Sequence, residues 1–151
     1  MRLGKGEASS PQEIPSLDKE ATGSKVLPVY LDALLRYDGQ IHSIKAMIDS
    51  GATGNFVDHL LLEKLGIPTQ LKDRPEAVQA VDGKPLSSGP ITEHTVALCM
   101  SCKTEAWTHH ETIRFNVIAA PQYGFILGMP WLKLHDPSID WEARRVSFRS
   151  P

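Results

Sequence analysis

The chain has 151 residues, of which 41% are hydrophobic, and its formal net charge at pH 7 is -2. These values fit one ordinary globular domain, and the charge argues against nucleic acid as a partner because it supplies no broad positive field. Two cysteines are too few for a disulfide-rich secreted scaffold, and no apolar run could span a bilayer, so we expect an intracellular, cytoplasmic protein without a membrane partner.

The N-terminal residues 1–24 are rich in Gly, Ser, Pro, Glu and Lys and carry few large apolar side chains. Ordering such a segment costs more conformational entropy than burial returns, so we predict a flexible arm. One domain is predicted over residues 25–150. It opens with apolar runs at residues 26–35 and 41–48, and the Asp-Gly pair between them indicates a hairpin. The second run leads directly into Asp49.

Short elements follow. A strand at residues 56–57 precedes a helix at residues 59–65, for which Asp58 is the predicted N-cap. In residues 76–89, apolar alternation precedes an Asp-Gly pair and a polar segment follows it, which indicates a second hairpin with a mobile, polar return. Such a hairpin could serve as a lid.

The C-terminal half also contains several short apolar runs, which favours a mostly β, barrel-like domain with two short helices. Pro130 suits the first turn of the second helix. The predicted elements are strands at residues 91–98, 112–118 and 146–148, a loop through residues 99–103 and Trp107, an apolar-glycine unit at residues 125–128, and a helix at residues 131–135.

Asp49 stands between an apolar run and a series of small residues, Ser50 to Gly54. A buried strand can deliver such a carboxylate into a tight loop, where small neighbours let a substrate backbone approach closely. An isolated Asp-Ser-Gly tripeptide also occurs as a simple turn, in which the Asp side chain bonds to the backbone. Asp49 is therefore a candidate catalytic residue whose surroundings must decide between the two interpretations.

Three segments of the sequence belong together: residues 46–58, residues 80–90, and Leu127-Gly128 with Trp131-Leu132 and His135-Asp136-Pro137. They resemble the retropepsins, the aspartic proteases of retroviruses and long-terminal-repeat retrotransposons. Among these they are most similar to the protease of sushi-class Ty3/gypsy elements and its domesticated mammalian relatives, the retrotransposon Gag-like and paternally expressed proteins. The resemblance covers residues 26–148 and implies a retropepsin-like closed β-barrel with one or two short helices and a flap hairpin.

The resemblance implies an aspartic endopeptidase that needs no cofactor and processes polypeptides such as its own Gag-Pol-like polyprotein. Pepsin-type chemistry uses two carboxylates that share one proton, and this chain has one Asp-Ser-Gly loop, so the active form would be a homodimer. The implied roles are catalysis for Asp49, support of the catalytic loop for Ser50, Gly51 and Ala52, the flap tip for Val81, Asp82 and Gly83, a substrate pocket for Ile126, and a structural loop for Leu127 and Gly128.

Two positions depart from the retroviral pattern. Retroviral enzymes commonly have an Asp and an Arg, able to form an ion pair, where this chain has Thr53 and Met129. Because both charges are replaced, none is left buried alone, but the dimer loses a stabilising contact. We therefore predict weak dimerisation and weak activity. The alternative is a domesticated retropepsin fold with little or no catalysis that acts as a dimerisation or scaffolding module.

Cys99 and Cys102 have the spacing of a redox pair or of half a zinc site, with His109 and His110 as candidate partners. The spacing matches no common zinc motif, and His109-His110-Glu111 lacks the helical spacing of a metalloprotease site. We therefore expect ordinary thiols, a solvent-exposed strand start at residues 109–111, and no bound metal.

Overall fold

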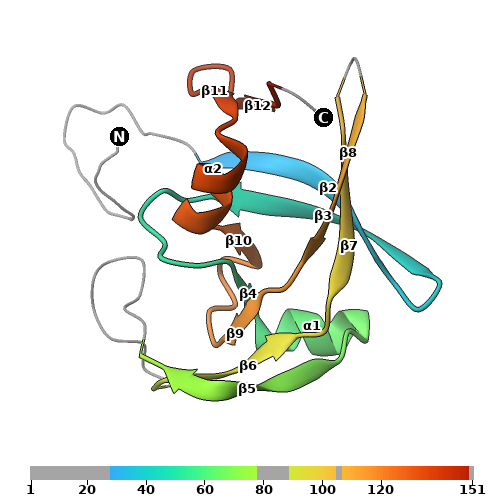
Figure 1. Ribbon diagram of the computed structural model, residues 1–151, viewed down its shortest axis with the longest axis vertical. Helices are drawn as coiled ribbons and strands as arrows, with labels where there is room; N and C mark the ends of the chain where they lie inside the picture. Colours follow the sequence, from blue (N-terminus) through green and yellow to red (C-terminus); the bar gives the residue numbers. More distant parts are fainter. Residues whose placement is uncertain (1–27, 78–88, 105–106, 150–151) are drawn as a thin grey trace.

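The computed structural model describes residues 28–77, 89–104 and 107–149, so the predicted arm and the predicted flap tip lie outside the described residues. Neither described helix is long and apolar enough to cross a membrane. The strands are β2 (Val29–Tyr37), β3 (Gln40–Ile48), β4 (Phe56–Asp58), β5 (Thr69–Glu76), β6 (Ile91–Thr95), β7 (Leu98–Lys103), β8 (Thr108–Ile113), β9 (Asn116–Ile118), β10 (Phe125–Leu127), β11 (Ser138–Asp140) and β12 (Arg145–Ser147), and the helices are α1 (His59–Leu65) and α2 (Met129–His135) (Figure 1).

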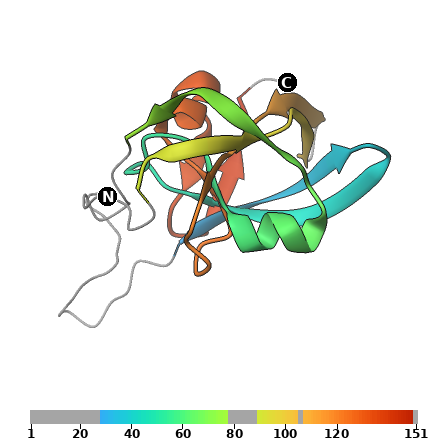
Figure 2. The same ribbon diagram turned by 90° about the horizontal axis from the view of Figure 1, so that it is seen from below.

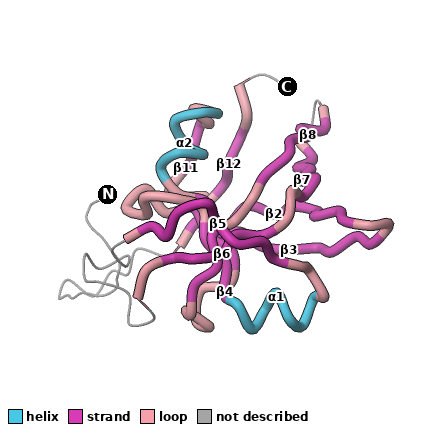
Figure 3. The backbone as a smooth tube through the Cα atoms, turned by 60° about the horizontal axis from the view of Figure 1, so that its bottom comes forward, coloured by secondary structure: helices cyan, strands magenta, loops and turns pink. Residues whose placement is uncertain are grey.

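Nine strands form one sheet in the order β5-β6-β9-β4-β10-β3-β2-β7-β8, and β11 pairs separately with β12. β5 and β6 run side by side at one end of the molecule, whereas β7 and β8 form a second antiparallel ribbon (Figures 1 and 2). The two helices lie far apart, with strands between them (Figure 3). The prediction of a mostly β domain with two short helices is confirmed.

The predicted closed barrel is wrong, because β5 and β8 are the two ends of the sheet and do not pair with each other. β5 was not predicted as a strand, and nearly all of it is exposed. Its charged residues Lys72, Asp73 and Arg74, followed by Pro75, suit an edge that must not pair with a further strand. The sheet therefore ends at β5.

The first hairpin follows its prediction closely. β2 alternates buried and exposed side chains along its length, and it pairs antiparallel with β3 up to the partners Tyr37 and Gln40. Asp38 and Gly39 both have positive φ, 50° and 78°. A two-residue hairpin turn whose twist matches that of the strands requires positive φ at both residues. This long hairpin carries the chain straight to Asp49.

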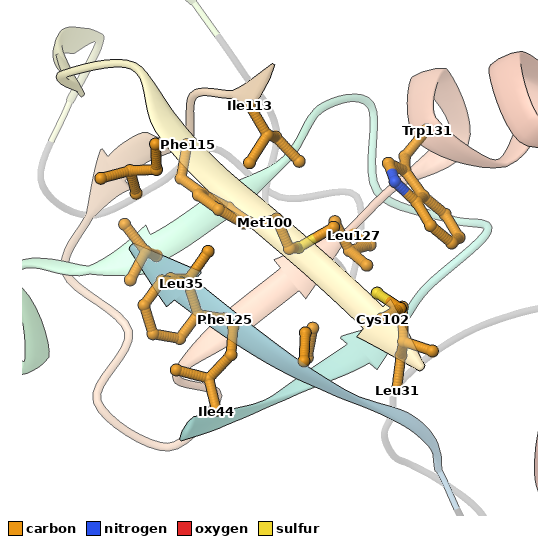
Figure 4. Packing of buried hydrophobic residues seen from close by; sticks show 14 of the residues in the cluster. Leu31, Leu35, Ile44, Met100, Cys102, Ile113, Phe115, Phe125, Leu127 and Trp131 are labelled. Carbon is orange, nitrogen blue, oxygen red and sulfur yellow. The ribbon is translucent and has the colours of Figure 1, made fainter. Parts of the chain in front are cut away.

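The core lies between the β2–β3 hairpin, β7, β8, β10 and α2 (Figure 4). The rings of Phe115 and Phe125 meet edge to face, with their centroids 5.1 Å apart. The largest fully buried side chains of this core include Leu35, Leu62, Leu98, Met100, Phe115, Phe125, Leu127 and Trp131.

The predicted loop at residues 99–103 is wrong, because this segment is part of β7. Met100 lies opposite Leu35 of β2, and both side chains are fully buried in the core. The predicted strand at residues 91–98 ends at Thr95, and the predicted strand at residues 112–118 is interrupted between Ile113 and Asn116. Where they break, the Thr95 N–H donates to the Phe115 carbonyl (2.8 Å) and the Phe115 N–H donates to the Thr95 hydroxyl (3.0 Å). These bonds satisfy the backbone at a corner where the chain changes neighbours.

Asp58 is the N-cap of α1, as predicted, and it also binds the backbone of a distant segment. One carboxylate oxygen, Oδ2, accepts from the N–H groups of Leu60 and Leu61, while Oδ1 accepts from the N–H of Ala120 at 2.9 Å. The carboxylate is almost fully buried and joins the start of α1 to the segment that follows β9. Gly66 ends the helix in the left-handed conformation, with φ 72°.

Candidate functional site

Asp49 lies where β10 passes between β3 and β4. β10 pairs in parallel with β3 and antiparallel with β4, so the loop that joins these two strands, residues 49–55, must cross the end of β10. The Asp49 N–H donates to the Leu127 carbonyl at 3.0 Å, and the Met129 N–H donates to the Ala52 carbonyl at 2.9 Å. The loop that carries Asp49 is therefore fixed to β10 at its start and to α2 further along.

Gly128 stands at this crossing, and only glycine fits there. A Cβ atom on Gly128 would lie 2.1 Å from the carbonyl oxygen of Gly54 and 2.7 Å from that of Ala52. The Gly128 N–H donates to Asn55 Oδ1 at 3.1 Å, and the Asn55 carbonyl accepts from the N–H of Asn116 at 2.8 Å. Sequence reasoning missed Asn55, whose side chain joins the two crossing segments; its place directly after a small-residue loop was the available signal.

The carboxylate of Asp49 has two different oxygens. Oδ1 accepts from the Gly51 N–H at 2.9 Å, whereas Oδ2 is buried and has no hydrogen-bond partner within residues 28–77, 89–104 and 107–149. Burial raises the pKa of Asp49 above its ordinary value, while hydrogen bonds from the N–H groups of Gly51 and Ala52 act in the opposite direction. A carboxyl group in this environment can hold a proton more readily than a solvated one.

The other predicted site residues differ in how exposed they are to solvent. Ser50 is exposed beside Asp49, and Ala52 is buried under the loop. Ile126, predicted to line a substrate pocket, is fully buried in a small cluster with Ala52, Phe56 and Ile118. The predicted flap residues Val81, Asp82 and Gly83 lie outside the described residues. A shallow hollow of about 470 Å³ is lined by residues of β2, β3, β7 and β8 and does not include Asp49.

The Cys-x-x-Cys pair does not form a shared site. Cys99 and Cys102 are three residues apart in β7, so their side chains point to opposite faces of the strand; Cys99 is exposed and Cys102 is buried. Burial raises the pKa of Cys102 to about 12, and the negative charge of Glu111 adds to the shift. Because the two thiols lie on opposite faces of β7, the two cysteines cannot bind one ion together.

The expected solvent exposure of residues 109–111 is wrong for His109 and Glu111, whereas His110 is exposed. The side chain of His109 is buried, and that of Glu111 is only 12% exposed. Glu111 accepts a hydrogen bond from the indole N–H of Trp131 in α2 and contacts two histidines, His109 and His135. Sequence reasoning missed this cluster because His135 lies in a different element, 24 residues beyond Glu111.

The raised pKa of Asp49 predicts how the stability of the single chain depends on pH. Because the carboxyl ionises less readily in the folded state, its contribution is fully present below the pKa of the unfolded chain, about 3.9 for Asp, and is lost as pH rises through the folded pKa. Asp49→Asn cannot ionise and keeps an acceptor for the Gly51 N–H. We expect this variant to melt at a higher temperature than wild type at pH 7.

This prediction is measured by thermal unfolding of monomeric protein between pH 3 and pH 8. The advantage of Asp49→Asn should shrink as the pH falls and disappear below about pH 4. The matched control is Asp73→Asn on the exposed edge strand β5, whose effect should be small throughout. A wild type that melts higher than Asp49→Asn at pH 7 contradicts the prediction.

Comparison with known proteins gives two findings. Residues 45–151 match the family model described as the PEG10/RTL1 protease domain, and this range includes the Asp49 loop, β10 and α2. The crystal structure of the retroviral protease-like domain of Ddi1 from Leishmania major is similar to this chain, with a TM-score of 0.52 and 18% sequence identity over 82% of this chain and 89% of that chain. At this identity the likeness shows the fold, and the predicted retropepsin-like fold class is confirmed.

Proposed function

Because this chain belongs to the PEG10/RTL1 protease domain family, we propose that it is an aspartic endopeptidase whose active form is a homodimer with one Asp49 from each protomer. The observation that carries the proposal is the state of the Asp49 carboxyl group. It lies at the end of β3, in a loop fixed by backbone hydrogen bonds, its pKa is raised by burial, and Oδ2 has no partner among the described residues. A second carboxyl group, from another protomer, would give Oδ2 a hydrogen-bond partner and complete the pair of carboxyl groups that the reaction needs.

In the proposed reaction the two Asp49 side chains share one proton. The ionised carboxylate takes a proton from a water molecule, whose oxygen attacks the scissile carbonyl carbon, while the other carboxyl gives its proton to the carbonyl oxygen. The tetrahedral intermediate then breaks its C–N bond as the amine nitrogen receives a proton, which leaves a new carboxyl end and a new amino end. Two carboxyl groups so close together cannot both be ionised, because their negative charges would repel each other, and this favours a shared proton.

The exposed residues beside Asp49 suit contact with a second chain. Ser50 is exposed and can offer its hydroxyl across a two-fold axis, and Gly51 leaves room for a substrate backbone. In this proposal Val81, Asp82 and Gly83 form the flap tip over the substrate, and cleavage takes place at mainly apolar sites in a Gag-Pol-like polyprotein.

One observation favours the second candidate, a dimerisation or scaffolding module with little catalysis. Neither Thr53 nor Met129 carries a charge, so these two positions can form no ion pair that fixes one protomer to the other. A weak dimer would spend most of its time as single chains, each with half of a site. The two candidates therefore differ in dimer affinity and in what the dimer does.

The chain fused to its natural flanking sequences should be incubated at mildly acid pH over a series of concentrations, with processing followed by mass spectrometry and dimerisation by analytical ultracentrifugation. We expect processing to increase more steeply than linearly with concentration until the dimer saturates, and to be absent in Asp49→Asn. Equal processing by both proteins would overturn the protease proposal. A demonstrated dimer of wild type without any processing would also overturn it and would support the scaffolding module.

A further inference from the structure

A cluster of ionisable side chains lies away from Asp49, between the edge strand β8 and the last turn of α2. It consists of His109 and Glu111 from β8 and His135 from α2. The Nε2 atom of His109 lies 2.9 Å from a carboxylate oxygen of Glu111, and the Nε2 atom of His135 lies 3.2 Å from the same carboxylate. We call these three residues the His-Glu-His cluster.

The donor atoms of the cluster converge as metal ligands do. One ligand atom from each of the three residues lies within 4.8 Å of the others. In a tetrahedral zinc site with Zn–N and Zn–O distances near 2.0–2.2 Å, neighbouring ligand atoms are roughly 3.3–3.5 Å apart. A tetrahedral site therefore requires each Nε2–carboxylate distance to lengthen by a few tenths of an ångström. It also requires the ligand atoms that lie up to 4.8 Å apart to move closer together.

The surroundings of the cluster are otherwise apolar. The ring of His109 stacks on Phe148 with the centroids 4.6 Å apart, and the ring of His135 lies 4.7 Å from the indole of Trp131. The Nδ1 atom of His109 is buried without a hydrogen-bond partner among the described residues. Apolar side chains could fill this space without leaving a buried polar atom unsatisfied, so packing alone does not explain the three polar residues.

The indole N–H of Trp131 fixes the carboxylate from outside the cluster. It donates to Glu111 Oε2 at 3.0 Å, which holds the carboxylate in place for the two histidines, as outer partners of metal ligands do. Cys102 lies opposite His109 in the β7–β8 ladder, but its thiol is not among the ligand atoms that converge in the cluster. The donor set is therefore two imidazole nitrogens and one carboxylate.

We propose that His109, Glu111 and His135 form a binding site for a divalent transition metal of the zinc class, which ties the edge strand β8 to α2. Two imidazoles and one carboxylate are donors that suit zinc, and three protein ligands leave the fourth tetrahedral position to water. The side chains are 8–14% exposed, so solvent reaches the cluster. The ion would stabilise the end of a helix whose first residue, Met129, supports the Asp49 loop.

The test is a zinc titration of the full chain after removal of metals by a chelator, followed by calorimetry and thermal unfolding. We expect one ion per chain and a melting temperature raised by roughly 5–10 °C when free zinc exceeds its dissociation constant a hundredfold. Ring ¹⁵N chemical shifts of His109 and His135 should change on zinc addition, while those of the exposed His110 should not. No binding, or shifts confined to other histidines, would overturn the proposal.

Glu111→Gln keeps the size of the side chain and an acceptor for Trp131, but it removes the anionic ligand. We expect zinc affinity to fall by more than the 10–100-fold that is typical when an outer partner is lost. The matched control is His110→Gln, one position away on β8, and Cys99→Ser excludes binding by the exposed thiol; both should bind as wild type does. If Glu111→Gln does not fold, His135→Gln replaces it, and unchanged affinity in the variant that folds contradicts the site.

Discussion

Gly128→Ala is expected to destabilise the domain by more than about 4 kcal/mol, which is enough to unfold a domain of ordinary stability at 37 °C or to leave it marginal. The added Cβ would lie 2.1 Å from the Gly54 carbonyl oxygen and 2.7 Å from that of Ala52. Both obstacles are backbone atoms, so no side-chain rotation can relieve the overlap. The β10 segment would have to move away from the loop that carries Asp49.

The matched control is Gly54→Ala, which makes the same chemical change on the other side of the crossing. Its Cβ would meet side-chain atoms of Asn116 and Phe56 at 3.2–3.3 Å, and these can shift by a few tenths of an ångström. We expect a loss of roughly 1 kcal/mol there. Urea unfolding measures both variants, and a Gly128→Ala protein as stable as Gly54→Ala would show that the crossing is not as tight as described.

Local signals allowed the prediction of elements whose geometry depends on a few adjacent residues. The Asp38-Gly39 turn, the Asp58 cap and the Pro130 helix start all fall where the sequence indicates them. β5 was missed because a Pro and several charged residues are unusual in strands except at edges. β7 was read as a loop because the burial of Met100 is decided by β2, which is distant in sequence.

The same distinction applies to the candidate site. Asp49 could be found because an apolar strand and small residues surround it in the sequence. Asn55 could not be assigned a role, since its partner Gly128 is 73 residues away and the bond exists only where the two segments cross. The closed barrel was expected from the resemblance, but closure would require the edge strands β5 and β8 to pair, and no local sequence pattern shows whether they do.

The proposed half-site has a consequence that distinguishes it from any site complete within one chain. In the proposed dimer each protomer would supply one Asp49 from a loop held by the Leu127 carbonyl and the Met129 N–H, so a variant that alters only the carboxylate should fold and pair normally. Asp49→Asn is such a variant, because the amide keeps an acceptor for the Gly51 N–H. A dimer with one wild-type and one Asp49→Asn chain would hold a single ionisable group where the chemistry needs two.

We therefore expect Asp49→Asn alone to lose at least about 10²–10⁴-fold in the rate of peptide cleavage, and we expect it to inhibit wild type on mixing. At constant total concentration, with all chains paired at random, activity should fall as the square of the wild-type fraction, to about one quarter in an equal mixture. Cleavage of a fluorogenic peptide measures this dependence. Asp73→Asn chains, altered on the exposed strand β5, should leave the mixture fully active. A linear dependence on the wild-type fraction, to about one half in the equal mixture, would mean that each chain cleaves independently, and the shared-carboxylate mechanism would then be wrong.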